Sequence, residues 1–218
     1  REEQWRAGGG GRAGASGGVG ACGGVGRTDG KRLVGCLSVG HAGVRLLVVD
    51  AGRVRGAAAV YVYLVVYLLL ATGSFAVVTT VGGRGDADHG LDAYRGLARR
   101  QPVLAGAFTL LLLGQAGVPF TGGFVAKLGV LAAAVEGRTY WLAIVAMAAA
   151  AVAAFVYLRI LVAMYLEDPG ADSIDRSEVP TGARVVVGVA CLGVLVVGVA
   201  PGLLLDIAAD AVPVLVGG

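Results

Sequence analysis

The sequence predicts an all-α protein, a polytopic bundle of transmembrane helices. Apolar residues make up 56% of the 218-residue chain and charged residues only 15%. The mean hydropathy is +0.78. Residues 57–81 form a run of 25 without a formal charge, whereas crossing a hydrocarbon core of roughly 30 Å takes about 20 apolar residues. A soluble globule needs a more polar surface than this composition supplies.

Residues 1–30 contain 12 glycines and no apolar stretch, so we expect them to be a disordered, Gly-rich segment. A GxGxxG match at residues 18–23 is not interpreted as a dinucleotide site, because no strand precedes it and Gly-rich sequence produces such matches by chance. The three cysteines lie far apart, and we expect neither a metal site nor a disulfide framework. The net charge of only +3 gives no indication of a nucleic-acid partner.

A transmembrane domain is expected over residues 31–205, followed by a short tail, 206–218. Its first span, 33–49, is marginal in length because His41 and Arg45 interrupt it. The second, 57–81, carries Tyr61, Tyr63 and Tyr67 near its start, as expected of an interfacial aromatic belt. Polar loops are predicted at 82–100 and 167–184, and the remaining uninterrupted spans at 140–166 and 185–205.

Residues 101–135 are apolar except for Lys127, but Gly and Pro interrupt them at 114–123. One straight helix of this length would measure about 52 Å, too long for one span. The segment is therefore either two spans, six in all, or one broken and partly re-entrant helix, five in all. A single broken helix divides the loop Lys and Arg residues nine to three between the two sides, against eight to four for two spans. The positive-inside rule thus favours the broken helix, with loop 82–100 cytoplasmic and the C-terminus outside.

Lys127 is the most informative residue, because a charge at membrane depth is costly unless it faces a polar or hydrated interior. It lies eight residues beyond Pro119. A break frees backbone carbonyls and admits water, so a lysine beside it can take up and release a proton. The alternative is a lysine that snorkels to the interface. The side chains of Gln115 and Thr121 are expected to hydrogen-bond the freed carbonyls. The residues expected to shape the break are Gln115, Gly117, Pro119, Thr121, Gly122 and Gly123.

Several spaced motifs carry a resemblance to a known family. They are Gln115-Ala-Gly-Val-Pro-Phe-Thr-Gly-Gly-Phe-Val-Ala-Lys127, then Trp141-Leu-Ala-Ile-Val and Tyr157-Leu-Arg159. Together with Lys31-Arg-Leu-Val-Gly and His41-Ala-Gly43, they resemble subunit N of respiratory complex I, the proton-pumping NADH:quinone oxidoreductase. The resemblance runs from about residue 29 to 205, and residues 1–28 do not resemble the family.

The resemblance implies half of an inverted-repeat, antiporter-like fold, because further helices precede the Lys31 segment in this family. It also implies an enzyme subunit without its own redox centre or bound cofactor, in an assembled complex that uses NADH and quinone. The implied partners are the other membrane subunits and the lipid bilayer, in a bacterial inner membrane. Lys127 falls on the lysine of the family's broken helix, which implies that it carries protons.

Three further residues have open assignments. His41 is either a proton relay or a hydrogen-bonded histidine between packed helices. We expect Arg159 to be an interfacial anchor or a salt-bridge partner rather than a carrier, and Lys31 to be an ion-pair partner or anchor. Two alternative functions also remain. The chain could belong to a cation/proton antiporter or a hydrogenase-linked complex, or be a fragment inactive on its own.

Overall fold

The computed structural model describes residues 54–82, 90–136, 138, 140–168, 179–202 and 204–208. Every element in these residues is helical, so the predicted all-α class is confirmed. The predicted disordered segment and the first span, with Lys31 and His41, lie outside the described residues. The elements are α3 (Val54–Gly82), the 3-10 helix η1 (Leu91–Tyr94), α4 (Leu97–Arg100), α5 (Pro102–Ala116), α6 (Gly122–Glu136), α7 (Tyr140–Leu166) and α8 (Thr181–Val199).

Three helices, α3, α7 and α8, are long and apolar enough to cross a membrane. The first two agree with the predicted spans 57–81 and 140–166. The third begins at Thr181 and ends at Val199, whereas the sequence predicted 185–205. Its end precedes Pro201, which disfavours helical backbone at Ala200. Residues 201–202 and 204–208 are helical again.

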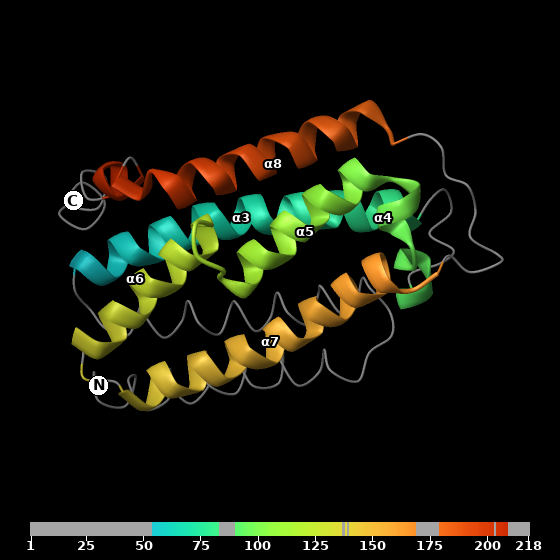
Figure 1. Cartoon of the computed structure of the whole chain (residues 1–218). Coiled ribbons are helices and arrows are strands. Elements are labelled where there is room, and N and C mark those ends of the chain that lie inside the picture. The colour runs from blue at the N-terminus through green and yellow to red at the C-terminus, as the bar shows by residue number, and fades with distance from the viewer. Residues whose placement is uncertain are drawn as a thin grey trace.

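Residues 102–136 form two half-length helices instead of one. α5 and α6 have 15 residues each, which corresponds to about 22 Å and is too short to cross the hydrocarbon core. Figure 1 shows that α6 continues from α5 in the same direction along the bundle. The predicted break between residues 114 and 123 is therefore present, with a half-length helix on each side of it.

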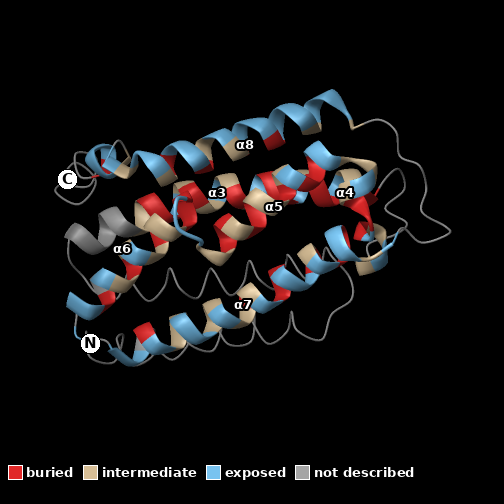
Figure 2. Cartoon of the chain, viewed as in Figure 1, coloured by how far each residue is buried: buried red, intermediate tan, exposed pale blue. Residues whose placement is uncertain are grey.

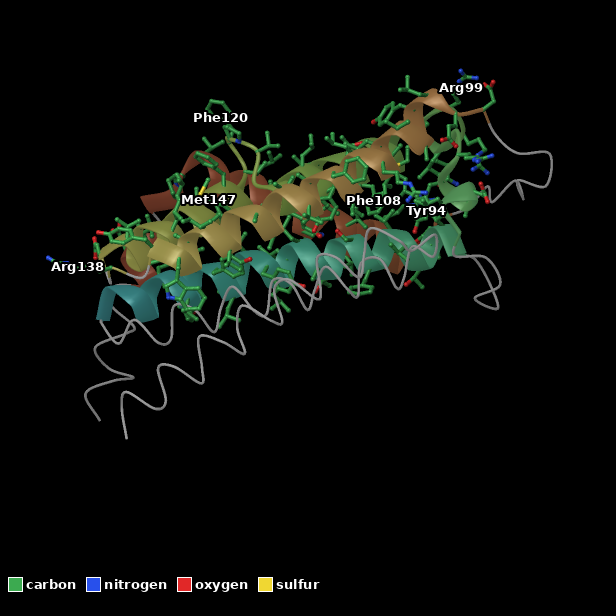
Figure 3. All side chains as sticks on the ribbon, turned by 90° about the horizontal axis from the view of Figure 1, so that it is seen from below. Tyr94, Arg99, Phe108, Phe120, Arg138 and Met147 are labelled. Atoms are coloured by element: carbon green, nitrogen blue, oxygen red, sulfur yellow. The ribbon has the colours of Figure 1, made fainter. Side chains whose placement is uncertain are left out.

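The segment 82–100, predicted as a polar loop, contains η1 and α4 in its described part. The backbone N–H of Gly96 donates to the carbonyl of Ala163 in α7 at 3.1 Å. Arg95 pairs with Glu167 at 2.7 Å, and Arg99 with Asp168 at 2.5 Å. These contacts fasten the segment to the C-terminal end of α7, which the hydropathy pattern alone did not indicate. Figure 3 shows Arg99 at this end of the bundle and Arg138 at the other.

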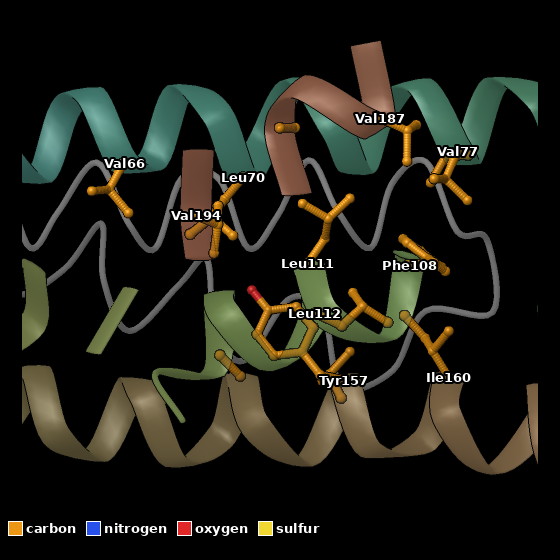
Figure 4. Packing of buried hydrophobic residues seen from close by; sticks show 14 of the residues in the cluster. Val66, Leu70, Val77, Phe108, Leu111, Leu112, Tyr157, Ile160, Val187 and Val194 are labelled. Carbon is orange, nitrogen blue, oxygen red and sulfur yellow. The ribbon is translucent and has the colours of Figure 1, made fainter. Parts of the chain in front are cut away.

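The core forms where α3 and α5 meet the neighbouring helices. α3 contacts α5, α6 and α8, and α5 also contacts α7. Figure 4 shows Leu70, Leu111, Phe108 and Val194 among the buried side chains at these contacts. Buried residues gather on α3 and α5, whereas α7 and α8 turn many exposed residues outward (Figure 2). Those outward faces are apolar, for example at Ile144 and Leu192, as expected of a surface that meets lipid or another membrane helix.

Candidate functional site

The C-terminus of α5 closes in a Schellman motif around Gly117. This glycine has φ of +87°, in the left-handed region that residues with a Cβ atom adopt at a cost. The N–H of Gly117 donates to the carbonyl of Gly114 at 3.1 Å, and the N–H of Val118 donates to that of Leu113 at 3.0 Å. Two of the last four carbonyls of the helix are thus satisfied by backbone donors.

Lys127, from the second turn of α6, binds the other two carbonyls at the C-terminus of α5. Its Nζ donates to the carbonyl of Gln115 at 2.8 Å and to that of Ala116 at 2.7 Å. A cation at a helix C-terminus also interacts favourably with the helix dipole. The aliphatic stem of Lys127 passes so close to Gly117 that a Cβ there would lie 2.8 Å from Cδ. The lysine therefore points into the break, and not outward as a snorkelling lysine would.

The side chain of Gln115 does not bind the freed carbonyls, so that prediction is wrong. Its amide nitrogen donates to Ser74 Oγ at 2.6 Å and to the carbonyl of Leu70 at 3.3 Å, both on α3. Its amide oxygen accepts a 2.9 Å hydrogen bond from the hydroxyl of Tyr157 on α7. The amide turns toward these partners because a buried polar group without a partner is costly, while Lys127 already occupies the freed carbonyls.

Tyr63 and Tyr67 were predicted to lie in an aromatic belt, and for Tyr63 this is wrong. Only 3% of Tyr63 is exposed, and its ring stacks on that of Tyr67 with centroids 6.3 Å apart. Both line a small cavity of about 10 Å³ together with Gln115 and Lys127. This is room for about one water molecule.

Close backbone packing holds the rest of the break. A Cβ on Gly123 would lie 1.8 Å from the carbonyl oxygen of Gly114, and one on Gly198 of α8 would lie 2.2 Å from that of Phe120. A Cβ on Gly122 would be less crowded, 3.2 Å from Cβ of Val197 and 3.3 Å from the carbonyl oxygen of Val194, both on α8. Thr121 donates its hydroxyl to the carbonyl of Val118 at 2.6 Å, within the connection itself.

Pro119 and Phe120 form the exposed outer side of this connection. Phe120 has φ of +69°, a conformation uncommon for a residue with a side chain. It is 79% exposed and projects away from the helices in Figure 3.

Arg159 lies apart from this site, on the exposed side of α7. It has no hydrogen-bond or ion-pair partner among the residues that the structure describes. His41 and Lys31 lie outside those residues. Sequence reasoning missed Ser74 and Tyr157 as members of the site, although polar side chains within apolar spans are a signal that could have indicated them.

Comparison with known proteins gives the family. Residues 13–153, more than half of the chain, match the model described as NADH:quinone oxidoreductase/Mrp antiporter, TM, so the match begins before residue 29, where the resemblance was expected to start. The chain belongs to this family. It is similar to NADH-quinone oxidoreductase subunit N from Salinispora arenicola, at 42% identity over 85% of this chain and 36% of the relative. The chain spans between 33% and 38% of the length of the curated relatives it matches.

Parts of two solved membrane complexes have a similar fold. The chain resembles part of respiratory complex I from Thermus thermophilus with bound aureothin. There the TM-score is 0.76 at 30% identity, over 89% of this chain and 43% of that one. It also resembles part of an Mrp complex from Dietzia, with a TM-score of 0.85 at 20% identity over 96% of this chain and 47% of that one. The second likeness concerns the fold alone.

Proposed function

We propose that this chain is part of a membrane-arm subunit of NADH-quinone oxidoreductase, similar to subunit N, and that it takes part in proton translocation with Lys127 as a proton carrier. The observation that carries the proposal is the ammonium of Lys127 between two carbonyls of a broken helix. The family match and the subunit N relatives support the assignment to this complex.

The surroundings of Lys127 suit a group that both holds and releases a proton. Two carbonyls and the C-terminus of α5 stabilise the charged form, whereas the apolar helices around it favour the neutral form. The ammonium has three N–H donors, and two of them are used at the carbonyls. The third is available to a water molecule in the adjoining cavity, through which a proton can leave.

In this function the chain contributes no redox chemistry. NADH and quinone react elsewhere in the assembled complex, and the energy reaches Lys127 through neighbouring membrane subunits, by electrostatics and changes in hydration. The complex lies in the bacterial inner membrane. The end of the bundle with Arg95 and Arg99 faces the cytoplasm, as the positive-inside rule favours.

Lys127→Ala in the assembled complex tests the proposal. Inverted membrane vesicles are given NADH, and proton uptake is measured per NADH oxidised. We expect this ratio to fall although the complex assembles. Arg159→Gln is the matched control, because it removes a cation from a neighbouring helix without touching the break. Wild-type pumping by an intact Lys127→Ala complex would overturn the proposal.

A second candidate is a subunit of a cation/proton antiporter, favoured by the Mrp antiporters within the same family. Sodium-dependent proton movement in vesicles that receive no NADH would support it. Pumping that requires NADH and stops with a quinone-site inhibitor would exclude it.

A further inference from the structure

Three buried polar side chains meet beside Lys127. Ser74 of α3 is 0% exposed and Gln115 of α5 is 4% exposed, and Tyr157 of α7 is 1% exposed. The Gln115 amide bridges the other two, with Nε2 2.6 Å from Ser74 Oγ and Oε1 2.9 Å from the Tyr157 hydroxyl. Figure 4 shows the Tyr157 ring extending from α7 toward α5, with its hydroxyl at the tip.

The bonds determine how the Gln115 amide is oriented. A primary amide has two N–H donors and one carbonyl acceptor. Here the nitrogen donates to Ser74 and to the Leu70 carbonyl, and the oxygen accepts from Tyr157. Turning the amide over would place its oxygen against the Leu70 carbonyl oxygen, so that two acceptors would face each other with no proton between them, which is costly in an apolar interior. The side chain of Gln115 is therefore held from two helices at once.

The same residue supplies one of the two carbonyls that bind Lys127. Nζ of Lys127 lies 2.8 Å from the backbone carbonyl oxygen of Gln115. The side chain of Gln115 is bonded to Ser74 and Tyr157, which are 41 and 42 residues away along the chain. We propose that Ser74, Gln115 and Tyr157 are positioning residues that form a polar clamp, which fixes the carbonyl acceptors of Lys127 and thereby controls proton transfer at the break. This inference rests on the proposed role of Lys127 as a proton carrier.

The titratable and polar side chains that line the cavity with Lys127 come from α3 and α5. From α3, Tyr63 and Tyr67 line the cavity with Lys127, and α5 contributes Gln115 to it. Neither α7 nor α8 adds a titratable side chain to this lining in the described part of the chain. Tyr157 of α7 is hydrogen-bonded to Gln115 and also interacts with Tyr67 and Tyr63. A loosened clamp changes how the ammonium is bound without adding a charge to the site.

Tyr157→Phe tests the clamp in the assembled complex, because it removes one hydroxyl from a buried ring of the same shape. Tyr165→Phe is the matched control. It lies on the same helix, is exposed, and its hydroxyl shares a 3.1 Å hydrogen bond with Thr109 away from the break. Protons taken up per NADH oxidised are measured in inverted vesicles across a range of pH.

With Tyr157→Phe we expect about a fivefold loss of proton uptake per NADH, the effect of one buried hydrogen bond. We also expect the pH of half-maximal pumping to move by roughly half a unit. A purely structural defect would lower proton uptake by the same factor at every pH and leave the pH of half-maximal pumping unchanged. In a Lys127→Ala background Tyr157→Phe should have no further effect, because coupled residues are not additive.

An unchanged pH profile, or an effect of equal size in the Lys127→Ala background, would overturn the clamp. If the Tyr157→Phe complex does not assemble, Ser74→Ala is used instead, because it removes the other side-chain partner of the Gln115 amide. Its proton uptake per NADH and the pH dependence of that uptake then test the clamp. The two proposals fail in different ways. Normal pumping by Lys127→Ala overturns the function of Lys127, whereas defective Lys127→Ala beside normal Tyr157→Phe overturns the clamp alone.

Discussion

The ammonium of Lys127 donates to the backbone carbonyl of Ala116 at 2.7 Å, so the residue proposed to carry protons also completes the C-terminus of α5. The two roles are linked, because the carbonyls that stabilise the charge are those that the helix break leaves free. Withdrawal of Lys127 exposes these carbonyls, whereas loss of its proton leaves two N–H donors and removes the charge that strengthens both hydrogen bonds. The conformation of the break therefore depends on the state of this side chain.

Lys127→Met should loosen the break without unfolding the bundle. Methionine has similar length and no donor, so the carbonyls of Gln115 and Ala116 lose their charge-assisted bonds, each worth roughly 1.5–3 kcal/mol. We expect faster hydrogen–deuterium exchange over residues 117–124, with exchange in the middle of α3 unchanged. Equal exchange in the variant and the wild type would show that Lys127 does not hold the break.

Gly117→Ala should destabilise the chain by more than 1 kcal/mol. The left-handed backbone at Gly117 costs roughly 1–2 kcal/mol for a residue with a Cβ, and that Cβ would lie 2.8 Å from Cδ of Lys127. The matched control is Gly106→Ala in the same helix, where a Cβ meets nothing within 4 Å and alanine favours helix. The measurement is the thermal unfolding temperature of the detergent-solubilised chain. The prediction is wrong if both variants unfold at the same temperature.

Local composition was sufficient to predict the break and, within the described residues, the spans 57–81 and 140–166, whereas the predicted span 185–205 is observed at Thr181–Val199. The bounds of α7 and the place of Lys127 beyond Pro119 follow from where charges, Gly and Pro interrupt apolar sequence. The partners of Gln115 could not be predicted this way, because Ser74 and Tyr157 lie on other helices. In a membrane helix that is apolar all round, no polar face marks the side that turns inward. For this reason Tyr63 looked like a belt residue although it is buried.

Arg159→Leu should leave proton translocation per NADH unchanged, because Arg159 lies on the exposed side of α7 and away from the break. We expect the amount of assembled complex in the membrane to fall, since an exposed cation near the end of a span anchors it at the interface or pairs with an acidic group outside the described chain. Quantitative immunoblots of native gels measure assembly. The conservative variant Arg159→Lys should restore it. A lowered proton ratio in the assembled Arg159→Leu complex would instead make Arg159 part of the proton path.

Gly123→Ala should separate the two halves of the broken helix. A Cβ at this position would lie 1.8 Å from the carbonyl oxygen of Gly114, and backbone cannot withdraw as the tip of a flexible side chain can. α6 would have to shift away from α5, which moves Lys127 out of reach of the Gln115 and Ala116 carbonyls. Pumping is expected to fall as far as in Lys127→Ala.

The matched control for this variant is Gly188→Ala in α8, where the added Cβ meets nothing within 4 Å. Both variants add one methyl group to a glycine in an apolar helix, so membrane insertion should be equal. Proton uptake and complex assembly are measured for each. If Gly123→Ala takes up protons as the wild type does, Lys127 can act from a shifted α6. The close approach of α5 and α6 would then not be needed to place this lysine.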